Sequence, residues 1–364
     1  MSETATASSP VLIRSDQVIL YGGLAAVVVS GLAHYLGWDS VLAFVLSAAA
    51  VCLLASLVGR SVEQLGDRFG PGATGVLQSA LGNLPELFIC IFALKAGLVD
   101  VVRAALVGSI LANLLLVLGL AFVVGGLRNG TQQLGSERAR TIVVLMLLSV
   151  TAMAIPSFTR FIHTSAGAHE KAFSVITSVI LLALFALSLP FSLAKQSGSG
   201  AAEPGGGEAP RWPIALAVGL LAAAGLGAAF VSDWFVAALT PAMDSAGINQ
   251  TFAGLVIVAI AGNAIENVVG VQLAAKNNSE YAFSVILNSP LQIALVLAPV
   301  LVLVSQIFGL ATLTLVFSPQ LVIVLMLAII LAAFIAFDGE STWLEGAALI
   351  ALYGIVATSF WWGG

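Results

Sequence analysis

The sequence predicts an all-α membrane protein that crosses the bilayer about eleven times, and three observations support this prediction. First, 60% of its 364 residues are hydrophobic and only 9% are charged, whereas a soluble domain carries roughly a quarter charged residues. Second, apolar runs of about 20 residues recur, each long enough to cross a hydrocarbon layer about 30 Å thick. Third, one six-residue pattern occurs twice, which indicates an internal repeat. A soluble fold is therefore excluded.

The apolar runs are continuous, which excludes a membrane β-barrel, because barrel strands alternate apolar and polar residues. Charge clusters separate the runs and set their approximate ends. The expected spans are 17–37, 40–60, 72–96, 100–126, 138–158, 170–193, 212–236, 250–275, 280–306, 317–337 and 342–361. Trp361 and Trp362 close the last span, as expected for an aromatic anchor at the membrane interface.

Basic residues are distributed unequally between the two sides of these spans. The side of the N-terminus carries nine, namely Arg14, Arg60, Arg68, Arg128, Arg138, Arg140, Lys195, Arg211 and Lys276. The other side carries four, namely Lys95, Arg103, Arg160 and Lys171. The positive-inside rule therefore predicts a cytoplasmic N-terminus and an external C-terminus. Arg14 is the only basic residue among the first 17, which argues against a cleaved signal peptide.

A Gly-, Ser- and Pro-rich segment, residues 195–211, predicts a flexible cytoplasmic linker. We expect Glu203 and Glu208 within it to be solvated rather than to sense Ca²⁺. The linker divides the chain into a tail and first helix (1–38), a first five-helix repeat (39–194) and a second five-helix repeat (212–364).

The repeat is visible in two motifs 180 residues apart, Leu81-Gly82-Asn83-Leu84-Pro85-Glu86 and Ala261-Gly262-Asn263-Ala264-Ile265-Glu266. At the same offset, Ser109 corresponds to Ser289, each in the span after its motif. Because each block has an odd number of spans, the two copies enter the membrane from opposite sides. Inverted repeats of this kind are typical of secondary transporters, whose substrate site lies at the midplane between them.

Glu86 and Glu266 are the two of the eighteen acidic residues that fall well inside predicted spans. An intramembrane carboxylate costs at least a few kcal/mol and indicates function. Because the two residues occupy equivalent positions in the repeat, a functional role is favoured over that of protonated residues that only pack. Gly82, Gly262 and Pro85 predict that both spans are interrupted beside the carboxylates, which exposes carbonyl oxygens.

The polar residues around the carboxylates are hard oxygen donors, which suit Ca²⁺. Ser109 and Asn113 share one helix face, as do Asn288 and Gln292. Interhelical hydrogen bonding is the alternative role of these side chains. The candidate cation- and proton-binding residues are Glu86, Glu266, Asn83, Asn263, Gly82, Gly262, Ser109, Asn113, Ser289 and Gln292, with Glu86 and Glu266 as the Ca²⁺-binding carboxylates.

Other metal chemistry is not favoured, because no Cys or His lies beside the motifs. Cys52 and Cys90 fall inside apolar runs and are interpreted as packing residues. The three histidines are at span ends, namely His34, His163 and His169.

The two carboxylates also supply a coupling mechanism. Burial and mutual repulsion favour their protonated form, whereas a bound divalent cation favours the ionised form. Protons and the cation therefore compete for the same oxygens, and one cation exchanges for up to two protons without a second site. The pair titrates as one coupled system.

Further motifs extend the pattern over most of the chain, from about residue 55 to the C-terminus. They are Glu63-Gln64-Leu65-Gly66-Asp67-Arg68-Phe69-Gly70, Gly108-Ser109-Ile110-Leu111, Asn113-Leu114-Leu115, Gln292-Ile293-Ala294, Ala298-Pro299, Asp338-Gly339 with Ser341, and Trp343-Leu344-Glu345-Gly346. With both repeat motifs, they make the chain resemble the Ca²⁺/H⁺ antiporter (CAX) branch of the cation/Ca²⁺ exchanger superfamily.

That resemblance implies a core of two inverted five-helix repeats plus an extra first helix. It also implies that Glu86 and Glu266 bind cation and proton in alternation and that cytosolic Ca²⁺ is exported. We expect a multi-pass protein of a prokaryotic plasma (inner) membrane, whose partners are membrane lipid and transported cations. No resident cofactor and no nucleic-acid partner are expected.

Three departures from the family pattern lie beside the site. Asn267 stands where this branch usually has a histidine, Leu84-Pro85 replaces a smaller pair, and Asn288-Ser289-Pro290 replaces Gly-Ser-Ser. Because Asn267 does not titrate, Na⁺-coupled Ca²⁺ exchange and Na⁺/H⁺ exchange stay open as alternatives. A passive cation channel would also use oxygen ligands, but inverted repeats favour alternating access. An intramembrane hydrolase lacks a recognisable nucleophile arrangement.

Overall fold

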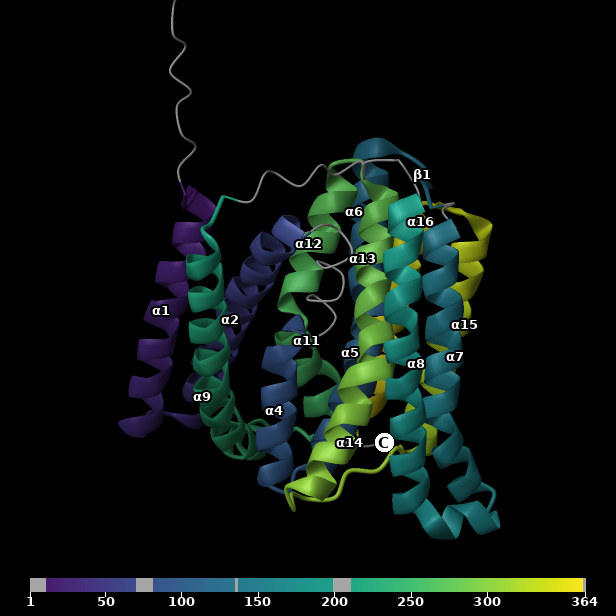
Figure 1. Ribbon diagram of the computed structural model, residues 1–364. Coiled ribbons are helices and arrows are strands. Elements are labelled where there is room, and N and C mark those ends of the chain that lie inside the picture. Colours follow the sequence, from purple (N-terminus) through teal and green to yellow (C-terminus); the bar gives the residue numbers. More distant parts are fainter. Residues whose placement is uncertain (1–10, 70–80, 135–136, 199–210, 363–364) are drawn as a thin grey trace, which may run out of the picture.

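The computed structural model describes residues 11–69, 81–134, 137–198 and 211–362 (Figure 1). The side chains at 67, 69, 137–139, 190–198 and 264–267 lie outside this description. The predicted all-α membrane fold is confirmed. Apart from one two-stranded sheet, the described part of the chain folds into helices and their connections.

The first half of the chain, up to the linker, contains ten described elements. They are α1 (Arg14–Tyr35), α2 (Ser40–Phe69), α4 (Leu84–Lys95), α5 (Val99–Leu111), η1 (Ala112–Val117), α6 (Leu118–Asn129), β1 (Gln132–Gln133), α7 (Glu137–Phe161), η2 (Ser165–His169) and α8 (Glu170–Gly198).

The second half begins after the linker. Its elements are α9 (Ile214–Ala246), α10 (Gln250–Phe252), η3 (Ala253–Val258), α11 (Ala259–Gly262), α12 (Ala264–Ala275), α13 (Ser279–Gln292), η4 (Ile293–Leu297), α14 (Ala298–Ile307), α15 (Pro319–Asp338), β2 (Glu340–Ser341) and α16 (Trp343–Trp361).

Nine helical segments within the described residues are long and apolar enough to cross a membrane. The two further spans expected at 72–96 and 250–275 are those that carry the motifs. In the described residues the second of these spans is built from shorter helices, because it is interrupted at Gly262-Asn263. The first span is described from Leu81 onward, where α4 begins after Gly82-Asn83. The total of eleven spans therefore stays a prediction. Helices α2 and α9 continue past the expected ends at 60 and 236, to Phe69 and Ala246.

Element bounds in the two halves follow the 180-residue offset of the motifs. Helices α4 and α12 each contain 12 residues and start at positions 84 and 264. The continuous segments α5–η1–α6 and α13–η4–α14 each contain a π-helical stretch, at 112–117 and 293–297. π-Helical turns inside α-helices are frequent at functional sites. The inverted relation of the halves stays a prediction.

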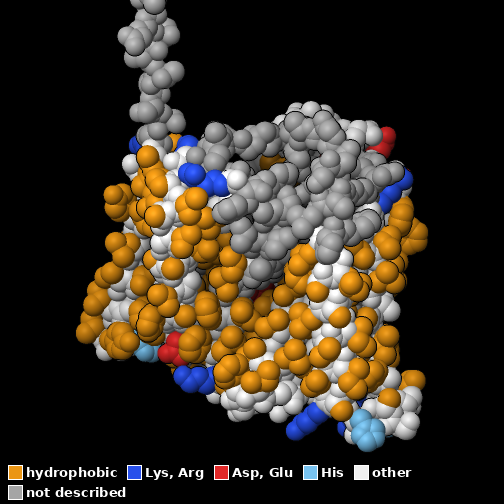
Figure 2. All heavy atoms as spheres, viewed as in Figure 1, with side chains coloured by type: hydrophobic (Ala, Val, Ile, Leu, Met, Phe, Trp, Pro, Cys, Tyr) orange, Lys and Arg blue, Asp and Glu red, His pale blue; other side chains and the backbone are white. Residues whose placement is uncertain are grey.

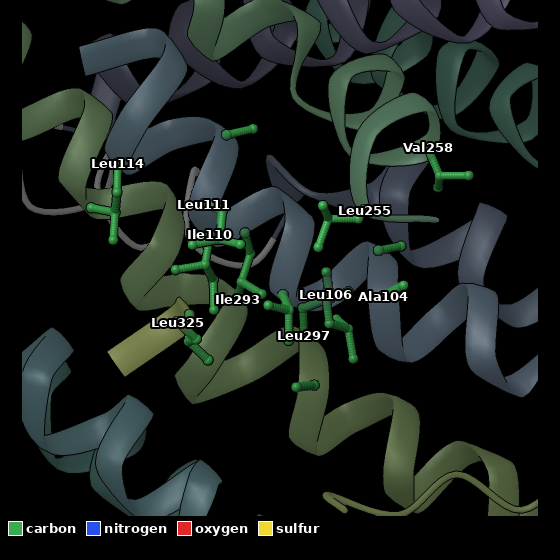
Figure 3. Close-up of a cluster of buried hydrophobic side chains, with 14 of the residues drawn as sticks. Ala104, Leu106, Ile110, Leu111, Leu114, Leu255, Val258, Ile293, Leu297 and Leu325 are labelled. Carbon is green, nitrogen blue, oxygen red and sulfur yellow. The ribbon is translucent and has the colours of Figure 1, made fainter. Parts of the chain in front are cut away.

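The helices form two groups with a buried central layer (Figure 1). Helices α1, α2 and α9 pack together on one side, and α7, α8, α15 and α16 lie on the other. Between them, the α5–α6 and α13–α14 segments are the most buried of the long helices. Leu106, Ile110, Leu255, Ile293 and Leu297 lie close together at the contact between the two halves (Figure 3).

Apolar side chains dominate the flanks of the molecule, and Lys and Arg side chains lie toward its two ends (Figure 2). Val18, Tyr21, Leu24 and Val28 of α1, for example, are exposed. In water such a surface is unfavourable, whereas in a bilayer it contacts lipid tails. The surface therefore matches the predicted membrane environment.

Candidate cation site

The second motif interrupts a helix, as predicted from its glycine, and the first motif contains a turn directly before a helix. In the second motif α11 ends at Gly262 and α12 begins at Ala264, with Asn263 between them at φ −99° and ψ 19°. In the first motif Gly82 and Asn83 form a turn before α4, and Asn83 has φ −93° and ψ 18°. Pro85 lies in the first turn of α4, where its missing N–H removes no helical hydrogen bond.

Glu86 is the third residue of α4 and is only 1% exposed. The positive end of the helix dipole faces the first turn and stabilises a carboxylate there. The Ser109 hydroxyl on α5 donates a hydrogen bond to Glu86 Oε1. Glu86 also lies against the second motif, because a Cβ added at Gly262 would be 3.4 Å from Glu86 Cγ. The backbone of the second motif thus lies directly beside the Glu86 side chain of the first.

Asn113 connects the two halves beside this carboxylate. Its Nδ2 donates to Asn263 Oδ1 at 2.8 Å, to the Ser109 carbonyl at 2.9 Å and to Ser289 Oγ at 3.4 Å. Ser289 Oγ also donates to Asn263 Oδ1 at 3.3 Å, and Asn263 Nδ2 donates to the Ala259 carbonyl at 2.8 Å. The side chains of Asn113, Asn263 and Ser289 are all buried, and they come from η1, from the break between α11 and α12, and from α13.

The carbonyl oxygen of the Asn113 side chain is buried and has no hydrogen-bond partner among the residues that the structure describes. An unsatisfied buried acceptor costs about 1–3 kcal/mol. A cation that accepts this oxygen as a ligand would remove that cost. The oxygen is therefore well suited to coordinate a cation beside Glu86.

The amides of the two halves are paired crosswise. Asn83 Nδ2 of the first motif donates to Gln292 Oε1 of the second half at 3.4 Å. Asn263 of the second motif is held by Asn113 of the first half. The structure therefore brings Asn83, Gly262, Asn263, Ser109, Asn113, Ser289 and Gln292 into one region with Glu86, and Gly82 adjoins Asn83.

Glu266 is the third residue of α12, which is the position that Glu86 has in α4. Its side chain, and that of Asn267, lie outside the described residues. The structure therefore gives the backbone position of the second carboxylate and leaves its contacts as a prediction.

Cys52 makes a contact with the site that was not predicted from the sequence. Its Sγ donates to the Ala261 carbonyl at 3.5 Å, immediately before the break in the second motif. The interpretation of Cys52 as a packing residue is therefore incomplete. Cys90, one helical turn after Glu86, is buried as expected. The signal that was overlooked is the repeat itself, since the 180-residue offset pairs Cys52 with another polar residue, Ser232.

Comparison with known proteins gives consistent results over almost the whole chain. The profile of the sodium/calcium exchanger protein family matches residues 39–194 and 216–362. A Ca²⁺/H⁺ antiporter of Synechocystis sp. is 36% identical over 348 residues, which cover 90% of this chain and 93% of that protein. The Ca²⁺/H⁺ antiporter ChaA of Bacillus subtilis is 35% identical, with 94% and 97% covered. The solved structure of native YfkE superimposes with a TM-score of 0.80 at 34% identity, with 94% of this chain and 99% of that chain covered.

Proposed function

Because the chain belongs to the sodium/calcium exchanger protein family, we propose that it exchanges Ca²⁺ for H⁺ across the membrane by alternating access. It is a transporter and not an enzyme. The observation that carries the proposal is the buried network that joins both motifs around Glu86. The names of the relatives support Ca²⁺/H⁺ exchange, so the Na⁺-coupled alternative is not favoured.

Ca²⁺ binds to carboxylate, amide and hydroxyl oxygens of both halves in this proposal. Glu86 and Glu266 supply the charge, and the oxygens of Asn113, Asn263 and Ser289 complete the shell. A hydroxyl either donates or accepts, because its hydrogen rotates. Ser109 thus donates to an ionised Glu86 and turns a lone pair toward a bound cation. Asn83 and Gln292 hold the turn at the first motif.

Charge balance explains why two carboxylates are used. One Ca²⁺ with two carboxylates is neutral, and so are the same two carboxylates with two protons. Moving the site between the two sides of the membrane then buries no net charge, which avoids a large desolvation cost. Because the cation and the protons occupy the same oxygens, each leaves only when the other binds. This competition couples the two fluxes without a second site.

The proposal also includes the topology of the chain, its orientation and the membrane in which it lies. Residues 39–194 and 212–364 are two inverted five-helix repeats, and residues 195–211 are a cytoplasmic linker after an added first helix. The separate family matches at 39–194 and 216–362 support this division. The excess of Lys and Arg on the linker side supports a cytoplasmic N-terminus. With that orientation the protein exports cytosolic Ca²⁺ through the plasma membrane of a prokaryote. Its partners are lipid and the transported ions, and it needs no resident cofactor.

Reconstitution in liposomes that contain a trapped pH indicator tests the function. With the interior acidic, Ca²⁺ added outside is expected to drive proton efflux in the absence of Na⁺. Glu86→Gln and Glu266→Gln are expected to abolish this efflux, because a neutral amide neither binds the proton nor compensates the cation charge. Glu280→Gln is the matched control, since Glu280 is exposed at the start of α13. It should keep wild-type efflux.

Two outcomes would contradict the proposal. Proton efflux that appears only when Na⁺ is present would mean that Na⁺ is the coupling ion. Ca²⁺ entry without any proton movement would mean that the protein is a channel.

A further inference from the structure

Two polar residues outside the site network occupy equivalent places in the repeat. Cys52 lies in α2 and Ser232 lies in α9, and the 180-residue offset relates them. The same offset relates Ala261, which precedes Gly262, to Leu81, which precedes Gly82. Each polar residue thus has one expected partner, namely the carbonyl that precedes the Gly-Asn pair of the motif in the opposite half.

The first of these contacts is present. Cys52 Sγ donates to the Ala261 carbonyl at 3.5 Å. Helix α2 packs against both α11 and α12, which flank the break in the second motif. The thiol therefore holds one end of that break to α2.

The second contact is not formed. Ser232 is fully buried, and its hydroxyl has no hydrogen-bond partner among the described residues. Helical serines usually satisfy themselves on their own helix, as Ser47, Ser56 and Ser61 of α2 do. Ser232 does not, at a cost of about 1–3 kcal/mol. Helix α9 packs along α4, and Leu81 packs against an apolar cluster to which α9 contributes Ala217 and Ala224, the latter about two helical turns before Ser232.

We propose that Cys52 and Ser232 are positioning residues whose contacts alternate during transport. In the conformation described here, Cys52 holds the Ala261 carbonyl, and Ser232 has no hydrogen-bond partner among the described residues. In the opposite-facing conformation, Ser232 donates to the Leu81 carbonyl and Cys52 releases Ala261. This inference rests on the proposed alternating-access function, because inverted repeats exchange their conformations when the site changes sides. Each contact therefore stabilises one of the two states.

Reactivity of the Cys52 thiol gives a test that needs no transport. In the bonded state the adjacent carbonyl oxygen opposes formation of the thiolate, which is the species that a maleimide alkylates. Ser232→Ala weakens the state in which Cys52 is released, so alkylation of Cys52 should slow by about two- to tenfold, the range for one net hydrogen bond. Peptide mass spectrometry separates Cys52, which is half-buried, from Cys90, which is buried.

The controls distinguish positioning from packing. Ser178→Ala removes an equally buried serine hydroxyl from α8, where it bonds its own helix, and should leave Cys52 alkylation unchanged. Ser232→Cys keeps a donor and should restore part of the wild-type rate. If Ser232→Ala speeds alkylation or leaves it unchanged, the hydroxyl acts only in packing and the proposal is wrong.

Transport measured from each side of the membrane gives the second test. Ser232→Ala and Cys52→Ala remove contacts of opposite states, so they should move the apparent KM for Ca²⁺ at a given face in opposite directions. The change in KM should be smaller for Cys52→Ala, about twofold, because a thiol is a weak hydrogen-bond donor. Shifts in the same direction would overturn the alternation. If wild type moves no Ca²⁺ against H⁺, the proposed function fails, while the alkylation comparison still decides whether the two contacts are linked.

Discussion

The two half-sites share a pattern but are not copies of each other. The first half-site, defined as Gly82, Asn83, Glu86 and Ser109, matches the second, defined as Gly262, Asn263, Glu266 and Ser289, at every position. The neighbouring amides do not match. Asn113 corresponds to Ile293, and Gln292 corresponds to Ala112. The repeat has therefore kept the carboxylate and hydroxyl positions and changed the amides that support them.

This difference shows how the halves are joined. Each half provides one amide, and that amide bonds the motif asparagine of the other half, Asn113 with Asn263 and Gln292 with Asn83. The two cross-contacts are unequal, since the first is 2.8 Å long and the second 3.4 Å. Equivalent substitutions in the two half-sites should therefore have unequal effects.

The largest expected effect is a loss of stability, at the place where the backbones of the two halves are in direct contact. Gly108 on α5 faces η3 of the second half, and a Cβ there would be 2.2 Å from the Leu255 carbonyl oxygen. Gly108→Ala forces the two segments apart and should destabilise the protein by about 3 kcal/mol or more, beyond ordinary overpacking. A lower midpoint of thermal unfolding in detergent would show this.

Gly219→Ala in α9 is the matched substitution, because nothing lies within 4 Å of a Cβ there. It should be neutral or raise stability by up to about 1 kcal/mol through helix propensity. Equal midpoints for the two variants would show that the contact between α5 and η3 is loose, and would remove the reason to treat the half-sites as mechanically linked.

The next largest effect concerns Asn113 and Gln292, the two amides that each bond the motif asparagine of the other half. Asn113→Leu removes a donor to Asn263, to Ser289 and to the Ser109 carbonyl. It also removes a buried oxygen that is suited to the cation and has no partner in the described part of the chain. The apparent affinity for Ca²⁺ should fall by about tenfold or more, which corresponds to roughly 1.4 kcal/mol. The Ca²⁺ dependence of proton efflux measures it.

Gln292→Leu tests the other cross-contact by the same assay. Its bond to Asn83 is longer, and Asn83 is only partly buried, so the loss should be about threefold. A larger loss for Gln292→Leu than for Asn113→Leu would reverse the asymmetry inferred from the structure. Asn278→Ala, at the start of α13 and outside the network, should leave the affinity unchanged.

Much of the fold was predictable from the sequence, because membrane helices are local and leave long apolar runs. The break at Gly262-Asn263 and the turn at Gly82-Asn83 were also predictable, since Gly82, Gly262 and Pro85 act on their own backbone. The meeting of Glu86 with Gly262, and the crosswise pairing of the amides, depends on packing between segments distant in sequence. No local pattern encodes these contacts. The contact of Cys52 with Ala261 was not predictable for the same reason, because the two residues are 209 positions apart.

The last comparison separates the two serines by their hydrogen-bond acceptors. Ser109 donates to the Glu86 carboxyl group, whereas Ser289 donates to the amide oxygen of Asn263. A hydrogen bond to a carboxylate favours its ionised form and is worth about 1.5–3 kcal/mol. Ser109→Ala removes this preference, so Glu86 holds its proton more tightly and Ca²⁺ displaces it only at higher pH. The profile of Ca²⁺-driven proton efflux should therefore move upward by about one pH unit.

Ser289→Ala removes a bond to a neutral acceptor, so it should lower the rate of exchange by no more than about threefold and leave the pH profile in place. The two profiles, measured in the same liposomes, isolate the proton competition from general damage to the site. If both variants shift the profile equally, the two half-sites share one titration in which each serine supports its own carboxylate. The asymmetry would then be confined to the amides, and Glu266 would have the same hydroxyl contact that Glu86 has here.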